Sequence, residues 1–106
     1  SLDIARNIEY RKFEGEALCT LSKTFVAQGE PQKALDHCDK ALKIFQDIES
    51  PKGEAEALFA KSQALHQLAQ HKEAVSCAQQ ALAIFQRIES PLAEKVRQQL
   101  AEWGGP

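Results

Sequence analysis

The chain contains an internal repeat, and this repeat restricts the possible fold more than any other feature of the sequence. The segment Ala41–Pro51 returns forty positions later as Ala81–Pro91, with nine of its eleven residues identical. The same offset relates Glu16–Leu18 to Glu56–Leu58. A period of roughly 20–50 residues is typical of arrays whose units stack on one another and share a core. We therefore expect a single domain, residues 1–106, built from repeated units.

The offset also reaches the start of the chain. Leu2, Ile4, Ile8 and Glu9 match Leu42, Ile44, Ile48 and Glu49. The pattern predicts that residues 1–10 are the end of a preceding repeat, that 12–50 and 51–90 are two complete repeats, and that 91–103 form a capping helix or open a third. Since the chain begins with Ser1 and contains no methionine, we expect a piece of a longer array.

Within each unit the apolar residues recur every three or four positions, which is the spacing of an amphipathic helix. In the first unit they are Leu18, Leu21 and Phe25, followed by Ala34, Cys38, Ala41, Leu42, Phe45 and Ile48. Gly29 suits a helix C-terminal cap, and Pro31 suits the first position of the next helix.

Ser50-Pro51 and Ser90-Pro91 each predict a capping serine followed by proline at the first helical position. The turn at Ala69-Gln70-His71 has neither glycine nor proline, so the repeat alone places it. The sequence thus predicts an all-α chain with helices over about 2–9, 12–28, 31–49, 52–69, 71–89 and 91–103.

Small residues at fixed places identify the kind of repeat. They are Ser22, Ala34 and Ala41 in the first unit and Ser62, Ala74 and Ala81 in the second. Together with Leu18 and Leu58, with Phe25 and Leu65, and with Gly29-Glu30-Pro31, they resemble the tetratricopeptide repeat (TPR) family. The long period is similar to that of spindle-orientation scaffolds, kinesin light chains and bacterial signalling proteins of this family. The resemblance implies an α-solenoid of antiparallel helix hairpins wound into a right-handed superhelix.

The resemblance further implies that the first helix of each unit lines a concave groove for a peptide or a partner's helix. Carried onto this sequence, the groove-facing residues are Glu16, Cys19, Lys23 and Val26, then Glu56, Phe59, Gln63 and His66, with Gln99, Val96 and Trp103 extending the surface. We expect Phe59 to be the apolar anchor, although packing against the next helix explains an aromatic residue there equally well. For Trp103 we favour a covering role at the end of the array, and for Lys23 a solvated surface lysine.

An enzyme is not expected, because no nucleophile elbow, phosphate loop or paired-cysteine zinc motif occurs. The candidate nucleophiles are Cys19, Cys38 and Cys77, and the candidate bases are His37, His66 and His71. His37 and Cys38 are adjacent on one helix and so point about 100° apart. Cys38 fits the core, whereas Cys77 lies off it. A metal site from His66, His71 and Cys77 matches no known ligand spacing, so we expect neither metal nor cofactor.

Composition excludes several classes of partner. The net charge is −2 and no cluster of lysine and arginine occurs, so nucleic acid is not an expected partner. The longest apolar run, Ala81–Phe85, is far too short to cross a membrane. Three cysteines cannot all pair within one chain, which favours a reducing, cytoplasmic location.

The sequence therefore predicts a non-catalytic protein-interaction module within a larger signalling or scaffold protein. The alternative is an architectural one, in which the solenoid separates neighbouring domains or associates with itself through its ends. Leu2, Ile4 and Ile8 would then form the apolar surface of contact.

Overall fold

The computed structural model describes residues 2–104, with side chains from Asn7 to Gly104. Within that range the chain forms five α-helices and no strand, which confirms the expected all-α fold. The helices are α1 (Leu2–Ala27), α2 (Pro31–Asp47), α3 (Pro51–Gln67), α4 (His71–Arg87) and α5 (Leu92–Glu102).

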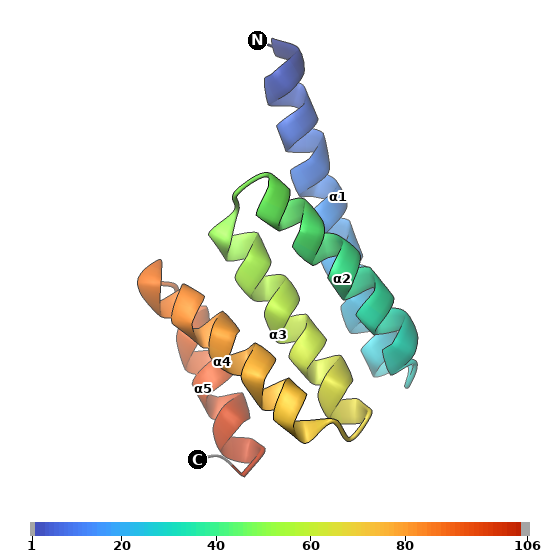
Figure 1. Ribbon diagram of the computed structural model, residues 1–106, viewed down its shortest axis with the longest axis vertical. Coiled ribbons are helices and arrows are strands. Elements are labelled where there is room, and N and C mark those ends of the chain that lie inside the picture. Colours follow the sequence, from blue (N-terminus) through green and yellow to red (C-terminus); the bar gives the residue numbers. More distant parts are fainter. Residues whose placement is uncertain (1, 105–106) are drawn as a thin grey trace.

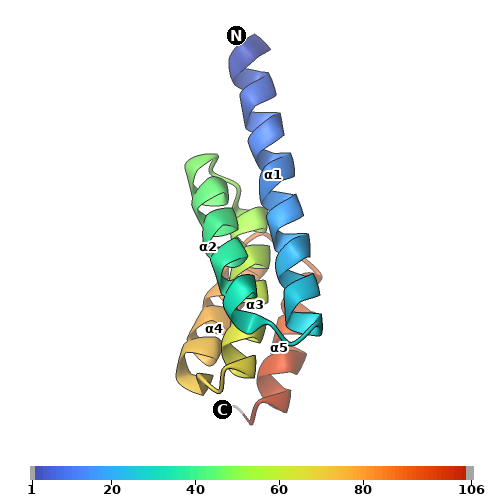
Figure 2. The ribbon, with the colours of Figure 1, turned by 90° about the vertical axis from the view of Figure 1, so that its right-hand side faces the viewer.

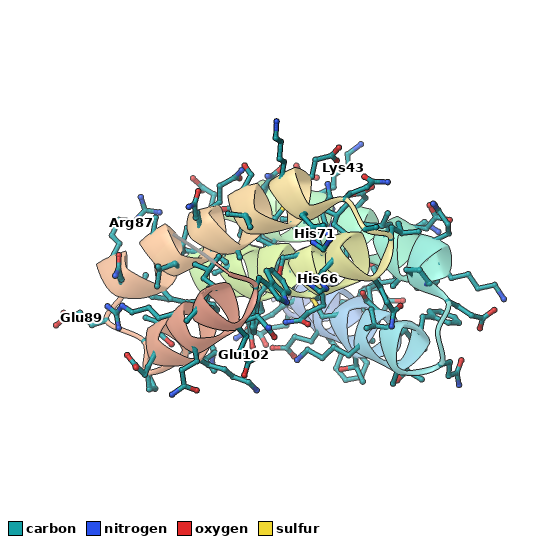
Figure 3. All side chains as sticks on the ribbon, turned by 90° about the horizontal axis from the view of Figure 1, so that it is seen from below. Lys43, His66, His71, Arg87, Glu89 and Glu102 are labelled. Carbon is teal, nitrogen blue, oxygen red and sulfur yellow. The ribbon has the colours of Figure 1, made fainter. Side chains whose placement is uncertain are left out.

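The helices form an extended stack in which each one packs antiparallel against the next (Figure 1). Seen end-on, α2 and α4 form one layer, and α1, α3 and α5 lie beneath them (Figure 3). In addition to these neighbours, α1 packs against α3. The result is a helical repeat solenoid that measures 49 × 30 × 17 Å.

The first helix differs from the prediction. The sequence predicted a break between residues 9 and 12, but α1 is one continuous helix of 26 residues (Figure 2). The two later turns have Ser-Pro after the glutamate, whereas Glu9 is followed by Tyr10 and Arg11. Without a capping serine or a proline, nothing ends the helix at this point. Residues 2–9 therefore form the first turns of α1 instead of a separate helix.

The other helix starts follow the capping signals closely. Pro51 is the first residue of α3, as expected, and the Ser50 hydroxyl accepts a hydrogen bond from the Gly53 amide at 3.3 Å. Ser90 likewise accepts from the Leu92 amide at 3.1 Å. Here α5 starts at Leu92, one residue later than expected.

All four connections between helices have the same geometry. The second residue of each connection has a positive φ; these residues are Gly29 (78°), Glu49 (55°), Ala69 (62°) and Glu89 (55°). At the first turn the Glu30 amide donates to the Phe25 carbonyl at 2.8 Å, and the Gly29 amide donates to the Val26 carbonyl at 3.1 Å. These two bonds define a Schellman motif, which satisfies carbonyl groups at the helix end. Equivalent pairs of bonds occur at the other three turns.

The core is built around two phenylalanines related by the repeat. Phe45 and Phe85 are each 1% exposed. Phe45 lies against backbone: a methyl group added at Gly15 would come within 2.7 Å of its ring, and one added at Gly53 would overlap it. Phe85 instead belongs to a cluster that includes Ala55 and Ala93.

The small residues expected at helix contacts are all fully buried. They are Ser22, Ala34, Ala41, Ser62, Ala74 and Ala81. The Ser22 hydroxyl donates to the Ala34 carbonyl at 3.1 Å and lies 2.7 Å from the Cys38 sulfur. One member of the apolar stripe of α1 lies outside the core: Leu21 is 45% exposed, and no described helix packs on that side of α1.

Candidate partner-binding groove

A cavity of about 410 Å³ opens on the side of α3 that lies between α1 and α5. In the end-on view of Figure 3, α1 and α5 lie on either side of α3, in the layer opposite α2 and α4. The lining residues come from these three helices and, at the base, from α4. They are Lys23, Glu56, Phe59, Ala60, Gln63, Phe85, Leu92, Lys95, Gln98, Gln99 and Glu102. We call this surface the groove.

The structure brings together five of the nine residues that the sequence assigned to partner binding. Lys23, Glu56, Phe59, Gln63 and Gln99 all line the groove. Glu56, Phe59 and Gln63 are three and four residues apart, so they lie on one face of α3. Gln99 lines the same cavity from α5. These residues therefore form one continuous surface across three helices.

Phe59 combines the two roles that the sequence left open. Its side chain is half-buried and packs against the cluster around Phe85. The same side chain also lines the groove, where it lies beside Leu92 and Ala60. Part of its ring is thus available to a ligand while the rest is fixed by the core.

Three amide and carboxylate side chains form a chain of hydrogen bonds along one wall. The Gln63 Nε2 donates to the Gln99 Oε1 at 3.0 Å, and the Gln99 Nε2 donates to the Glu102 Oε2 at 3.1 Å. The first bond joins α3 to α5. Because amides both donate and accept, this wall suits the peptide groups of an extended ligand.

The charges of the groove balance. Lys23 and Lys95 provide two cations, and Glu56 and Glu102 provide two anions. Such a surface does not attract ligands of one sign over a distance. Recognition here depends on local contacts.

His66 lies at one end of the same side of the molecule and takes part in an aromatic stack. Its ring lies flat on Trp103, with centroids 4.4 Å apart and planes 13° apart. His71 meets His66 edge-on at 4.8 Å (Figure 3). Trp103 is half-buried and packs on the core cluster of α3, α4 and α5. Trp103 thus covers the last face of the stack, as the sequence favoured, and holds His66 in place.

The remaining expected groove residues do not line the cavity. Glu16 is exposed on α1, and Val26 is half-buried, with its carbonyl accepting from Gln67 Nε2 at 2.8 Å. Two of the residues expected on the groove surface are instead buried. Cys19 is 7% exposed and Val96 is fully buried, because α2 and α4 cover them.

Sequence reasoning missed six residues of the groove. They are Ala60 on α3, Phe85 on α4, and Leu92, Lys95, Gln98 and Glu102 on α5. The positions 92, 95, 99 and 102 advance by three, four and three, so helical spacing from Gln99 was a signal for Leu92, Lys95 and Glu102.

The side chains considered for catalysis are placed unfavourably for it. Burial raises the pKa of Cys19 to about 12 and that of Cys38 to about 11, and it also raises the pKa of Cys77. The His37 ring turns to its own helix, with Nδ1 2.8 Å from the Lys33 carbonyl. From Asn7 to Gly104, no three histidine, cysteine or acidic side chains gather as a metal-binding group.

Lys61 stands where the first repeat has Leu21, and it forms an ion pair with a neighbouring helix. Its ammonium lies 2.9 Å from a carboxylate oxygen of Asp39 on α2. This hydrogen bond raises the pKa of Lys61. Lys61 therefore contributes an ion pair to the contact between α2 and α3.

Fold and groove together define a helical-hairpin repeat protein with a surface groove that crosses three of its helices. The family model described as the tetratricopeptide repeat matches residues 13–87. The chain therefore belongs to the tetratricopeptide repeat family. Domains of this family generally mediate protein–protein interaction and are typically non-catalytic.

A solved structure with the same fold is the TPR domain of FLU from Arabidopsis. It is 24% identical, with a TM-score of 0.72 over 89% of this chain and 86% of that one. A search among curated proteins gives no match. In the described part of the chain, no helix is both long enough and apolar enough to span a membrane.

Proposed function

We propose that the groove binds an extended peptide or a single helix of a partner protein, with Phe59 as its apolar anchor. The observation that supports this most directly is the position of Phe59, half-buried between an apolar floor and a wall of amides. A cavity with an apolar base and a few oriented polar groups is the usual form of a binding site. No cofactor or metal is part of the proposal.

The proposed binding mode assigns roles to the groove residues. An apolar side chain of the ligand inserts beside Phe59 and Leu92, and the Gln63–Gln99 pair hydrogen-bonds to the ligand's polar groups. The charged side chains set the direction of a ligand that carries both signs of charge. Its anionic groups would pair with Lys23 and Lys95, and its cationic groups with Glu56 and Glu102.

A displayed library of random peptides tests the proposal without knowledge of the partner. Peptides selected on the wild-type chain are measured against Phe59→Ala and Lys23→Glu. Loss of an anchor of about 2 kcal/mol weakens binding roughly 30-fold. Lys43→Glu is the matched control, because Lys43 is exposed on α2 and points away from the groove (Figure 3).

Phe59 also packs on the core, so its variant needs a check of folding. Circular dichroism establishes that Phe59→Ala remains helical, and Gln63→Ala provides a second groove variant that leaves the core intact. Selected peptides that bind all groove variants and the wild type equally would contradict the proposal. Failure to enrich any peptide would instead favour the architectural role, in which the solenoid only positions its neighbours.

We further propose a reducing compartment such as the cytoplasm. In support of this, all three cysteines are free thiols, and two of them are buried in the core. An oxidising compartment would place these thiols at risk of mispairing whenever the chain unfolds.

A further inference from the structure

From Tyr10 to Thr24 the outer face of α1 is uncharged and largely apolar, and no described helix covers it. Six residues lie on it: Tyr10, Phe13, Ala17, Thr20, Leu21 and Thr24. At 100° per residue these positions fall within an arc of about 100° along four turns of the helix. All six are exposed, and Tyr10, Phe13 and Leu21 are 68%, 70% and 45% exposed. We call this surface the α1 face.

The two threonines add to the apolar character of the α1 face. The Thr20 hydroxyl donates to the Glu16 carbonyl at 3.1 Å, and the Thr24 hydroxyl donates to the Thr20 carbonyl at 3.1 Å. Both hydroxyl groups are thus satisfied within their own helix. Their methyl groups remain for contact with another molecule.

The repeat shows what this face does elsewhere in the chain. Forty positions later the corresponding residues of α3 are Gly53, Ala57, Ala60 and Ala64, all buried, with Lys61 paired to Asp39 of α2. On α3, therefore, this face packs against the second helix of the preceding repeat. On α1 the same face is exposed.

A further repeat of the same kind does not fit the α1 face. Where α3 has Gly53, in contact with the ring of Phe45, α1 has Phe13. A methyl group at Gly53 would already overlap that ring, so a whole phenyl group excludes this mode of stacking. The face requires an occupant of a different shape.

We propose that the α1 face pairs with the α1 face of a second copy of this chain, antiparallel about a two-fold axis at Ala17. In that arrangement Phe13 meets Leu21 of the second copy and Tyr10 meets Thr24, each twice. Large side chains thus meet smaller ones, and the small Ala17 at the centre lets the helices approach closely. A two-fold contact of this kind is self-complementary and closed.

The available area is sufficient for such a pair. Tyr10 and Phe13 together expose on the order of 300 Å², given the roughly 150–250 Å² of a full aromatic side chain. With the four smaller residues the face provides on the order of 500 Å², so a dimer buries about 1,000 Å² in total, the lower bound for a specific interface. No described helix packs over the α1 face, so the helix of a second copy can reach it (Figure 2). The six residues of the face carry no charge that would oppose burial.

Sedimentation equilibrium between about 1 µM and about 1 mM tests the pairing, a range that covers weak dimers. We expect the wild type to dimerise with increasing concentration. Phe13→Glu and Leu21→Lys should each weaken dimerisation at least 10-fold, because each places a charge in the interface. Ile88→Glu is the control, since Ile88 is 37% exposed at the far end of α4 and should leave the dimer unchanged.

Mixing the two variants tests the antiparallel register. In the mixed dimer, glutamate at position 13 of one copy meets lysine at position 21 of the other, while the second pair is the native Leu21 with Phe13. The mixture should therefore dimerise more strongly than either variant alone. A wild type that stays monomeric at the highest concentration, variants that dimerise like the wild type, or a mixture that stays monomeric would each overturn the proposal. Peptide binding in the groove is independent of all three results.

Discussion

Ala69 adopts a backbone conformation that alanine disfavours, so replacing it with glycine should stabilise the chain. Its φ is 62°, and the turn is held by bonds from the Ala69 amide to the His66 carbonyl and from the Gln70 amide to the Leu65 carbonyl, both 2.9 Å. The left-handed conformation costs a residue with a Cβ about 1–2 kcal/mol. Glycine removes this cost, although its greater conformational freedom in the unfolded chain reduces the gain in stability by about 0.4–1 kcal/mol.

The expected gain for Ala69→Gly is therefore about 0.5–1 kcal/mol in the free energy of unfolding. Little else changes, because Ala69 is exposed. For a chain of this size the gain corresponds to a rise of roughly 2–8 °C in Tm. Thermal and urea denaturation followed by circular dichroism measure both quantities.

Gly29→Ala is the matched control, with the opposite sign. Gly29 has a φ of 78°, and nothing lies within 4 Å of a methyl group added there, so the variant reports backbone strain alone. We expect it to lose about 1 kcal/mol. If Gly29→Ala is destabilised while Ala69→Gly is unchanged or destabilised, the argument that the two turns share one geometry is refuted.

Three further predictions follow from the core and the array end. Gly53→Ala should lower the free energy of unfolding by about 1–2 kcal/mol in urea titrations, because the added methyl group overlaps the Phe45 ring, although alanine has a higher helix propensity than glycine. Phe45→Leu in the same chain should relieve part of this loss. At pH 8 iodoacetamide should alkylate Cys77 well before Cys19, because the raised pKa of Cys19, about 12 against 9.0, lowers its thiolate fraction roughly a thousandfold. The same shift means that the neutral Cys19 thiol contributes to the free energy of unfolding below about pH 9. This contribution decreases as the pH rises toward 12. Trp103→Ala should destabilise the chain by about 2–3 kcal/mol and increase amide exchange in α5.

The buried half of this fold could be predicted from the sequence because its residues repeat. Phe45 and Phe85 lie in nearly identical stretches of sequence and occupy equivalent positions in the core. Leu21 could not be placed in the same way. A first helix in a stack has one face toward its own second helix and another toward the preceding unit, and helical spacing alone does not reveal whether that unit is present.

Local signals explain the other differences. Gly29 marks its turn, but Ala69 adopts the same left-handed geometry with no glycine, because the Schellman bonds and the packing of the flanking helices impose it. Likewise, the likeness of residues 2–9 to a second helix concerns their apolar positions, whereas the end of a helix depends on capping residues that are missing after Glu9. Apolar spacing and helix termination are separate pieces of information.

The contrast between core and groove indicates where the specificity of this chain lies. Positions that are buried in both repeats keep their residues or nearly their size, as at Ser22 and Ser62. Among the positions predicted to face the groove, Glu16 and Glu56 are the same residue, whereas Lys23 corresponds to Gln63, and both of these line the groove.

The lining differs in chemistry from one repeat to the next, with a cation on α1, an aromatic ring and an amide on α3, and mixed charges on α5. In the proposed binding mode, a ligand that lies across the three helices meets a different environment at each one, which would fix its direction and register. On that proposal, the shared core holds the helices of the groove in place, and the lining residues that differ between the helices determine which ligand is preferred.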